Sequence, residues 1–352
     1  MSEATISPAS TLQSSVVPID SILLVSFGGP EGPEDVLPFL ENVLRGKNVP
    51  HERMLEVAEH YYHFGGVSPI NAQNRSLLEA MKTELAARGV TLPIYWGNRN
   101  WHPLLTKTLD AMVTDGKRRA LAFFTNMFSS YSGCRQYREN IAQAQEQVGP
   151  SAPRIDKVRF GFNHPEFIAA QCDLLASALQ GLATTHDVPV LFTAHSIPMS
   201  MADNCRYVIQ LKEAASLISE KVGVTNWELV YQSRSGPPTQ PWLEPDVCDA
   251  IRRLAHGGTR ALAIVPLGFI SDHMEVLYDL DTEAAELCTA LGIQLARVPT
   301  VGIHPAFVRM VADLIEERLH QRPERPSLGT YGPSHDVCPA DCCLYPRTRP
   351  GS

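Results

Sequence analysis

The chain has 352 residues, 44% of them hydrophobic and 19% charged, so it can bury more than one hydrophobic core and we expect a folded enzyme. Its formal charge of -8, without a dense block of Lys or Arg, excludes the basic surface of a nucleic-acid-binding protein. It also lacks an apolar run of the roughly 20 residues that cross a bilayer, which excludes a transmembrane protein.

Residues 1–20 are rich in Ser and Thr but have neither the basic start nor the apolar core of a signal peptide, so we interpret them as a disordered tail. The eight cysteines are scattered along a long chain rather than packed into a small secreted domain. We therefore expect the reducing environment of the cytoplasm; the oligomeric state does not follow from the sequence, and a monomer is taken as the default.

After this tail, short apolar segments alternate with longer segments of helical periodicity, which is typical of an α/β fold with parallel sheets. The predicted strands cover residues 22–27, 92–96, 120–124, 155–160, 189–193, 228–232, 261–266 and 294–298. The predicted helices include residues 35–43, 76–88, 104–114, 136–147, 166–179, 208–221, 246–256 and 306–319. These elements fit either one large sheet or two four-stranded parallel sheets flanked by helices.

A repeat along the sequence favours two sheets. The sequence NHPEF at 163–167, after the fourth predicted strand, resembles IHPAF at 303–307, after the last one. In both places Pro stands near the start of a predicted helix. We therefore predict two domains of one plan, residues 21–180 and 181–325, although two unrelated α/β halves can also produce such a match.

Two segments lie outside this repeat. Residues 44–74 have no counterpart in the second half and are rich in Tyr, His, Gly and Pro, which is typical of a lid over a ligand site. The Pro-rich sequence at 322–326 ends the last predicted helix, and a Cys-rich tail, residues 326–352, follows it.

Two loops beyond the carboxyl ends of predicted strands carry side chains suited to metal and proton chemistry. His195 follows the strand at 189–193 and Glu275 lies beyond the strand at 261–266, at the edge of a parallel sheet where ligands gather. Imidazole and carboxylate groups bind Fe(II), and both can carry protons. Taken one at a time, His195 also fits a residue that fills a strand end, and Glu275 a solvated surface charge.

Five sequence blocks around these residues occur in a fixed order: LLVSFGGP at 23–30, FGGVSPI at 64–70, TAHSIP at 193–198, QPWLEPD at 240–246 and PLGFISDHMEVLYD at 266–279. Together they resemble the ferrochelatase family. The resemblance implies two Rossmann-like domains of the chelatase type, each a four-stranded parallel sheet flanked by helices, with a porphyrin cleft between them. It assigns Fe(II) binding and proton transfer to His195 and Glu275.

A flat, mostly apolar macrocycle needs apolar walls and a few cations or hydroxyls for its propionates. From the resemblance and this requirement, the predicted substrate-binding residues are Ser68, Tyr137, Tyr61, Phe27, Arg45 and Trp242. A turn residue, core packing or a solvated surface charge explains several of these positions equally well. Part of the bacterial family has a Tyr in place of Phe27, and its oxygen can approach the iron, so we expect no metal ligand from that face.

Three cysteines, Cys338, Cys342 and Cys343, lie within six residues near the C-terminus and indicate a metal site. Thiolates suit zinc as well as an iron–sulfur cluster, and a tail without metal also fits the sequence. One bacterial branch of the family carries a [2Fe-2S] cluster on three C-terminal cysteines and one from an interior helix, so the resemblance implies Cys172 as the fourth ligand. Iron insertion changes no oxidation state, and we therefore expect a structural or sensor role.

The predicted function is insertion of Fe(II) into coproporphyrin III, with release of two protons, as in the coproporphyrin-using branch of this family. Protoporphyrin IX is the close alternative substrate, and a cobalt or nickel chelatase fits the same architecture. A non-catalytic tetrapyrrole-binding protein also fits two domains around a cleft, but simple capture does not need a proton acceptor beside a metal ligand.

Overall fold

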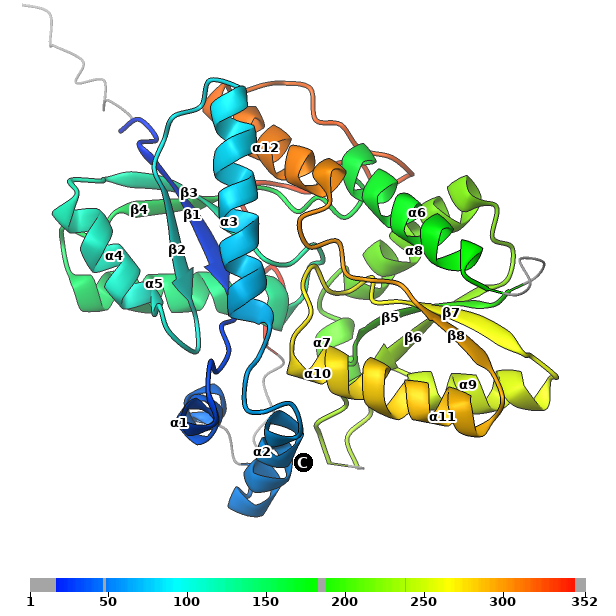
Figure 1. Ribbon diagram of the computed structural model, residues 1–352. Helices are drawn as coiled ribbons and strands as arrows, with labels where there is room; N and C mark the ends of the chain where they lie inside the picture. Colours follow the sequence, from blue (N-terminus) through cyan, green and yellow to red (C-terminus); the bar gives the residue numbers. More distant parts are fainter. Residues whose placement is uncertain (1–16, 47–48, 183–187, 238, 346–352) are drawn as a thin grey trace, which may run out of the picture.

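The computed structural model describes residues 17–46, 49–182, 188–237 and 239–345. Within them, the strands form two four-stranded parallel sheets, in the orders β2-β1-β3-β4 and β6-β5-β7-β8 (Figure 1). The prediction of two such sheets is confirmed. Residues 1–16 of the predicted N-terminal tail and 346–352 of the predicted Cys-rich tail lie outside the described residues. The strands are β1 Ser21–Ser26, β2 Ile94–Asn98, β3 Arg119–Phe124, β4 Arg154–Lys157, β5 Val190–His195, β6 Trp227–Gln232, β7 Ala261–Val265 and β8 Gln294–Arg297.

Each sheet is built around one apolar strand, β1 or β5, that is buried along almost its whole length. Continuous apolar runs of this kind are typical of parallel sheets covered by helices on both faces. In both sheets the first strand of the half lies between the second and the third. The two halves therefore share one topology, as the sequence repeat predicts.

Helices cover the sheets, and all those predicted from the sequence are present with ends shifted by a few residues. The structure adds α2, α7, the π-helical turn η1, and the run α10-η2-α11. The α-helices are α1 Pro33–Leu44, α2 His51–His63, α3 Ile70–Ala87, α4 Leu105–Thr114, α5 Gln136–Val148, α6 Pro165–Gln180, α7 Met199–Ala202, α8 Tyr207–Val222, α9 Val247–His256, α10 Met274–Val276, α11 Ala285–Ala290 and α12 Pro305–Leu319; the π-helices are η1 Tyr131–Arg135 and η2 Leu277–Ala284.

The repeated His-Pro sequence begins the last long helix of each half. His164 before α6 and His304 before α12 each accept a hydrogen bond from the backbone N–H two residues further on, at 3.3 Å. Each imidazole also faces an acid of the opposite helix: His164 Nε2 lies 3.7 Å from Asp313, and His304 Nε2 lies 3.7 Å from Asp173. The repeat therefore creates a matched pair of contacts between α6 and α12.

These two helices cross between the halves. α6 follows β4 but packs against α8, and α12 follows β8 but packs against α3 (Figure 1). Arg159, just after β4, forms two hydrogen bonds with the Glu317 carboxylate of α12, at 2.7 and 2.8 Å, and both side chains are buried. A division at the predicted boundary near residue 180 therefore matches the sequence repeat, but it leaves α6 and α12 each packed against a helix of the other half.

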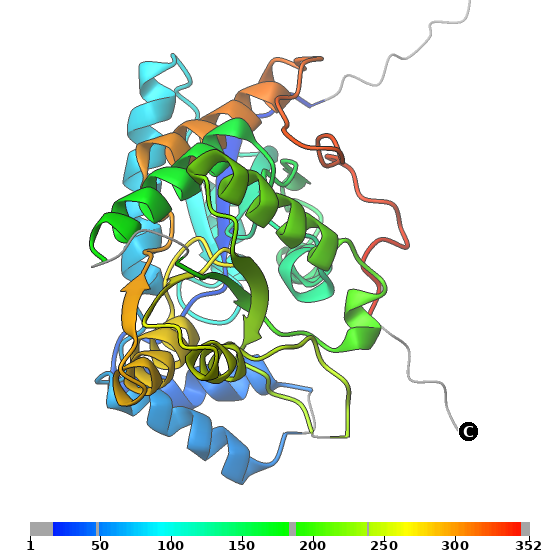
Figure 2. The same cartoon turned by 90° about the vertical axis from the view of Figure 1, so that its right-hand side faces the viewer.

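The segment predicted as a lid contains α2, which packs against α1 at one end of the molecule, beneath α10 and η2 (Figures 1 and 2). Met54, Ala58 and Tyr61 form the buried face of α2, with the spacing of an amphipathic helix. They belong to one hydrophobic cluster with Phe39 of α1 and Met274 of α10. The segment therefore connects the first half of the chain to the second.

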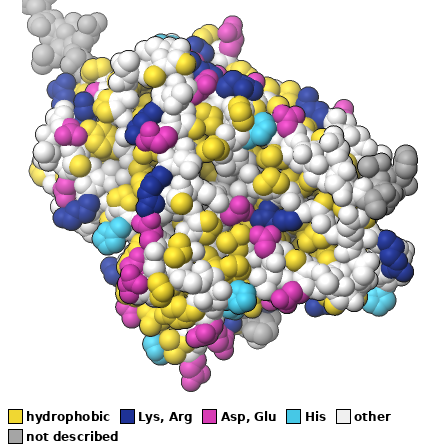
Figure 3. All heavy atoms as spheres, viewed as in Figure 1, with side chains coloured by type: hydrophobic (Ala, Val, Ile, Leu, Met, Phe, Trp, Pro, Cys, Tyr) yellow, Lys and Arg dark blue, Asp and Glu magenta, His cyan; other side chains and the backbone are white. Residues whose placement is uncertain are grey.

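The outer face of α2 presents apolar side chains next to acidic ones, seen at the lower left of Figure 3. Leu55 and Tyr62 are exposed there, at 41% and 38% of their surface. Among the helices that the structure describes, none combines the length and the apolar character needed to cross a membrane.

The chain beyond α12 runs along one side of the molecule (red in Figure 2) and is attached to both halves. In the first half, the Asn163 amide donates hydrogen bonds to the carbonyl oxygens of Leu328 and Gly332, at 3.0 and 2.9 Å. In the second half, the Glu213 carboxylate of α8 accepts a hydrogen bond from the Thr330 hydroxyl at 3.1 Å. The position of the tail is therefore set by specific contacts before it reaches its cysteines.

Candidate active site and thiol cluster

His195 is the last residue of β5, so its imidazole lies at the carboxyl edge of the second sheet. Its Nδ1 lies 2.5 Å from the carbonyl oxygen of Ser196, which can only accept a hydrogen bond. Nδ1 must therefore carry the proton of the neutral ring, and Nε2 keeps a lone pair for a metal ion or a proton. The Tyr207 hydroxyl donates to the His195 carbonyl oxygen at 3.2 Å and holds this end of the strand.

Glu275 reaches the same place from the loop after β7. The loop lies tightly against β5, because a Cβ on Gly268 would lie 2.7 Å from the Cβ of Ala194, and this approach requires glycine. Glu275 then occupies the first turn of α10, with Oε2 3.6 Å from His195 Nε2. The structure thus brings the two predicted residues together, and both stay partly exposed, at 34% for His195 and 48% for Glu275.

A second imidazole lies on the other side of this carboxylate. His273 Nδ1 is 4.0 Å from Glu275 Oε2. Burial lowers the pKa of His273, and the nearby Glu275 carboxylate opposes that shift, so the ring is neutral near pH 7. His273 belongs to the sequence block at 266–279, but the sequence alone predicts no role for it. The structure shows a His-Glu-His group rather than a pair.

Two further acids continue from Glu275 along η2, where wide π-helical turns place residues four apart on one face. Burial raises the pKa of Asp279 to about 7, against hydrogen bonds from Ser233 and Gln232 that lower it. Ser233 reaches this acid with a φ of 60°, a left-handed conformation that costs roughly 1 kcal/mol in a residue other than glycine. Burial also raises the pKa of Glu283. The three carboxyl groups form an acidic row, defined here as Glu275, Asp279 and Glu283.

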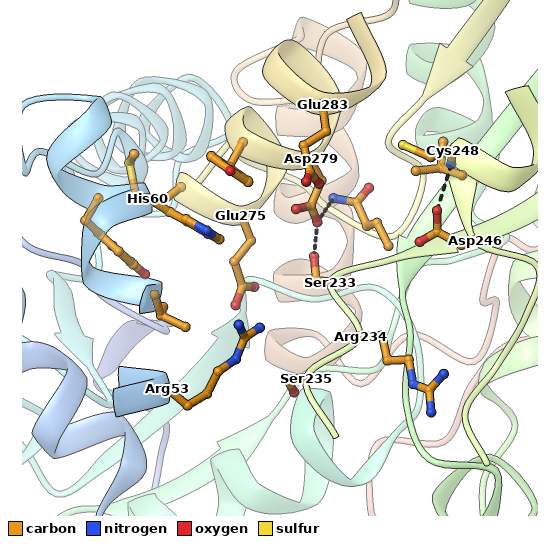
Figure 4. A pocket seen from close by; sticks show the side chains of 16 residues that line it. Arg53, His60, Ser233, Arg234, Ser235, Asp246, Cys248, Glu275, Asp279 and Glu283 are labelled. Carbon is orange, nitrogen blue, oxygen red and sulfur yellow. Dashed lines mark hydrogen bonds between the residues drawn. The ribbon is translucent and has the colours of Figure 1, made fainter. Parts of the chain in front are cut away.

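A cavity of about 400 Å³ lies between α2 and the acidic row (Figure 4). The α2 wall carries Arg53, His60 and Tyr61. In Figure 4 the Arg53 guanidinium and the Glu275 carboxylate point toward one another across the opening. His195 is not among the cavity-lining residues and meets the cavity through Glu275. The volume and the mixture of apolar and charged walls are those of a small-molecule site.

A His-Glu pair whose carboxylate lines a cavity between α2 and the second half of the chain, and whose imidazole has Nε2 facing that carboxylate, fits the arrangement that the resemblance implies. The family model described as Ferrochelatase matches residues 20–319. The chain belongs to the ferrochelatase family. Its activity is therefore that of a metal chelatase, a lyase of haem biosynthesis, with Fe(II) and a porphyrin as substrates.

Relatives of this chelatase match it over almost the full length of both chains. It is 62% identical to a ferrochelatase of Rhodopirellula baltica, over 96% of this chain and 97% of the relative. It is 49% identical to a coproporphyrin III ferrochelatase of Streptomyces coelicolor, over 95% of this chain and 96% of the relative. A coproporphyrin III ferrochelatase of Mycolicibacterium smegmatis is 50% identical, over 87% of this chain and 92% of the relative.

Solved chelatase structures share the two-sheet fold. SirB from Bacillus subtilis with Fe3+ matches with a TM-score of 0.54, at 14% identity, over 85% of this chain and 95% of that one. The sirohydrochlorin chelatase SirB from Bacillus subtilis subspecies spizizenii in complex with cobalt matches with a TM-score of 0.52, over 86% and 96%. At this identity the likeness concerns the fold alone, and it confirms the predicted chelatase-like architecture.

Two of the predicted substrate-binding residues of this ferrochelatase lie together at the carboxyl edge of the first sheet. The Arg99 guanidinium lies 5.6 Å from the centre of the Phe27 ring and 4.4 Å from that of Tyr137. Tyr137 is buried, whereas Phe27 is partly exposed and packs against the cluster of α1 and α2. Phe27 therefore offers an apolar surface backed by a cation.

The other predicted substrate-binding residues are distributed around the site. Tyr61 lines the cavity, and Ser68 is buried. The backbone of Trp242 forms an antiparallel β-bridge with Pro198, which lies in the loop after β5. The Trp242 indole N–H is buried without an acceptor among the described residues. Arg45 is exposed at the end of α1 and is not a cavity-lining residue, so the structure does not bring it to the site.

Asp279 gives the enzyme a specific dependence of stability on pH. Its folded pKa is raised from 3.8 to about 7, so between these pH values the unfolded chain loses a proton that the folded chain keeps, and the free energy of unfolding falls as pH rises. We expect Asp279→Asn to remove this fall, which is on the order of 4 kcal/mol. Thermal denaturation of both proteins from pH 4 to 8 checks this, and parallel curves would contradict it.

The C-terminal cysteines lie together with Cys134, which the sequence does not predict as a ligand. Cys338 Sγ lies 3.9 Å from Cys134 Sγ of η1, and Cys342 Sγ lies 3.5 Å from Cys343 Sγ. Cys343 has a φ of 54°, so the backbone turns left-handed where the two neighbouring thiols meet. Arg135, next to Cys134, donates to the Cys342 carbonyl oxygen at 3.1 Å. Four thiols from two distant segments therefore form one group.

Within this group the thiols differ in acidity. The hydrogen bond between Cys134 and Cys338 raises the pKa of Cys134 and lowers that of Cys338. The charges of Lys157 and Arg138 lower the Cys338 pKa further. The result is a thiol beside a thiolate, which is a donor set for a soft metal ion.

Cys172, the predicted fourth ligand, lies elsewhere. It is on α6, its Sγ contacts the Ile218 carbonyl oxygen of α8 at 3.9 Å, and burial raises its pKa to about 11. The thiol contacts that the structure describes join the tail to Cys134 instead. The structure therefore does not bring Cys172 to the thiol group, because α6 packs against α8.

Proposed function

We propose that the enzyme inserts Fe(II) into coproporphyrin III and releases two protons. The observation that carries this proposal is the 3.6 Å approach of His195 Nε2 to Glu275 Oε2 at the wall of the cavity. Metallation removes the two pyrrole protons and adds one divalent ion. A site for this reaction therefore needs a proton acceptor and a metal ligand within reach of the same ring atoms, and this pair supplies both.

In this proposal His195 is the residue that receives the pyrrole proton or the iron. Because Nδ1 is occupied by the Ser196 carbonyl oxygen, Nε2 is the nitrogen that accepts a pyrrole proton or binds the incoming iron. Glu275 supplies an oxygen ligand for Fe(II), and its negative charge stabilises the imidazolium that forms when Nε2 is protonated. His273, neutral and 4.0 Å from Glu275, adds a third donor to the group.

The acidic row supplies a path for the released protons. Asp279 lies one π-helical step from Glu275, and its pKa of about 7 allows it to accept and release a proton near neutral pH. Glu283 follows at the next step and lines the same cavity. Protons taken at the ring are handed along the row toward the cavity opening.

Coproporphyrin III has four propionates, whereas protoporphyrin IX has two propionates and two vinyl groups. Arg53 and Arg234 line the cavity and can pair with additional carboxylates. Relatives at about half identity over nearly the whole chain are named coproporphyrin III ferrochelatases. The two arginines, set among otherwise acidic walls, and this relationship are what support coproporphyrin III over protoporphyrin IX in this proposal.

This preference is testable with purified enzyme. Two partly exposed ion pairs together contribute about 1 kcal/mol, so we expect kcat/KM with coproporphyrin III to exceed that with protoporphyrin IX by about fivefold to tenfold. Anaerobic assays with Fe(II) and each porphyrin measure the ratio. Arg53→Gln is expected to reduce it, while Arg252→Gln, on the exposed face of α9, serves as the matched control. An equal or inverted ratio for the wild type would contradict the proposed substrate.

We further propose that Cys134, Cys338, Cys342 and Cys343 hold a [2Fe-2S] cluster. Two thiolates on one tetrahedral metal, with bonds of about 2.3 Å, lie ~3.8 Å apart. The two sulfurs of the Cys134–Cys338 pair are 3.9 Å apart, and those of the Cys342–Cys343 pair are 3.5 Å apart. Each pair therefore fits one iron. The Arg138 Nε is buried without an acceptor among the described residues, and Lys157 is 8% exposed, so cations that suit an anionic group are already present.

A bound [2Fe-2S] cluster supplies one-electron redox chemistry, which iron insertion does not use because the iron remains Fe(II). The four thiols instead join η1 of the first half to the end of the tail, and we assign them a structural role. We expect the purified protein to contain iron and acid-labile sulfide in equal amounts, once any bound substrate iron is subtracted. Zinc without sulfide would contradict the cluster.

A further inference from the structure

His335 lies beside the four thiols. One of its ring nitrogens and the Sγ atoms of Cys338 and Cys342 all lie within 4.8 Å of one another. The His335 imidazole is also among the neighbours that lower the pKa of the Cys338 thiol. The imidazole is therefore a fifth possible metal ligand beside the four thiols.

The place of His335 is set by contacts on both sides of it in the chain. Its carbonyl oxygen accepts a hydrogen bond from Lys157 Nζ at 2.9 Å. The next residue, Asp336, pairs with Arg318 at 3.1 Å and also with Arg325. The backbone is thereby fixed to β4 and α12, although the imidazole itself is exposed. An exposed histidine with a fixed backbone can keep a hydrogen bond to a neighbouring sulfur.

The thiols account for the four ligand positions of a [2Fe-2S] cluster, so the imidazole has a different role. A hydrogen bond to a coordinating sulfur stabilises the reduced cluster, because reduction places additional negative charge on the sulfurs. The positive charges of Lys157 and Arg138 also stabilise negative charge on the Cys338 sulfur. His335 differs from them in being solvent-exposed and in having a ring nitrogen within 4.8 Å of the Cys338 sulfur.

We propose that His335 donates an N–H hydrogen bond to the Cys338 sulfur and thereby raises the reduction potential of the cluster. This inference rests on the proposed cluster and adds a residue outside its ligands. When the cluster accepts one electron from an added reductant such as dithionite, one Fe(III) becomes Fe(II) and no bond to the protein breaks.

The test is a redox titration of the full-length enzyme with dithionite, followed by the visible absorbance of the cluster and by the electron paramagnetic resonance signal of its reduced form. We expect His335→Ala to keep the cluster and to show a lower midpoint potential than the wild type. His335→Gln retains an N–H donor and is expected to lie closer to the wild type. His256→Ala, an exposed histidine on α9, is the matched control and is expected to leave the potential unchanged.

The possible failures are distinguishable. An intact cluster with the same potential in His335→Ala and wild-type protein would overturn the role of His335 alone. Loss of the cluster from His335→Ala would also overturn it, because His335 would then be a ligand. Wild-type protein without cluster absorbance would overturn the proposed cluster together with this inference. A lower potential in His335→Ala that His335→Gln restores would support it.

Discussion

Replacing His195 by alanine is expected to lower kcat/KM for iron insertion by on the order of 10³-fold, the range for loss of a general base. The reason is the fixed tautomer: with Nδ1 bound to the Ser196 carbonyl oxygen, Nε2 is the accessible nitrogen beside Glu275. Glu275→Gln keeps the shape of the side chain but removes its charge, and we expect a loss of about 10²-fold or more. Anaerobic loss of porphyrin fluorescence with added Fe(II) measures both rates.

Porphyrin binding separates a chemical role from a structural one. Both variants are expected to bind coproporphyrin III with a dissociation constant close to that of the wild type, because neither side chain is needed to anchor propionates. His320→Ala, exposed at the end of α12, is the matched control for the loss of an imidazole. Wild-type turnover in both His195→Ala and Glu275→Gln would remove the proposed mechanism.

The sequence contains enough information for the sheets and for the central pair of the site. Strands such as β1 are continuous apolar runs, and such runs remain recognisable without knowledge of their neighbours. His195 and Glu275 follow strands of one sheet, and the geometry of parallel sheets brings such loops to one edge. Their 3.6 Å approach then depends on Gly268, whose role as a point of close contact is visible only in the structure.

The α10-η2-α11 run could not be recognised by helical periodicity. Its buried residues Val276, Leu280, Ala284 and Cys288 recur every four residues, whereas an α-helix buries residues at alternating spacings of three and four. The run therefore lacks the buried residues three apart that help to mark an amphipathic α-helix. The same spacing aligns the acidic row, so the missed helix and the missed Asp279 have one cause.

The helix α2 was missed for a different reason. Its buried residues Met54, Ala58 and Tyr61 do follow helical spacing, but the many His, Glu and Arg residues of the helix give the segment little overall apolar character. It is stabilised by the cluster that includes Phe39 and Met274, from elements before and far beyond it. Contacts with residues distant in the sequence stabilise this helix, and a local sequence pattern does not contain them.

The fourth thiol shows the limit of a resemblance that is transferred by position along the chain. Cys134 and Cys338 are 204 residues apart, and no local pattern relates them. Cys172 occupies an interior helix, as the resemblance implies, but α6 crosses to the second sheet and packs against α8. The ligand therefore has to be chosen by distance in the fold rather than by its place in the order of helices.

Cys134→Ser is accordingly expected to abolish the cluster, whereas Cys172→Ser is expected to retain it. The first substitution removes one thiol of the pair at 3.9 Å and leaves Cys338 without its partner on the same iron. The second removes a thiol whose contact is the Ile218 carbonyl oxygen. Visible absorbance, iron and acid-labile sulfide, measured on proteins purified without oxygen, distinguish the two variants.

The tail gives this comparison a second measurement. If Cys134 holds the tail through the cluster, Cys134→Ser should make the chain near Cys342 more susceptible to limited proteolysis, because the hydrogen bond from Arg135 remains as a weaker attachment. The wild type and Cys172→Ser should resist alike. Loss of the cluster in Cys172→Ser with its retention in Cys134→Ser would reverse the assignment. It would also mean that α6 lies closer to the tail in the loaded protein than its packing against α8 allows.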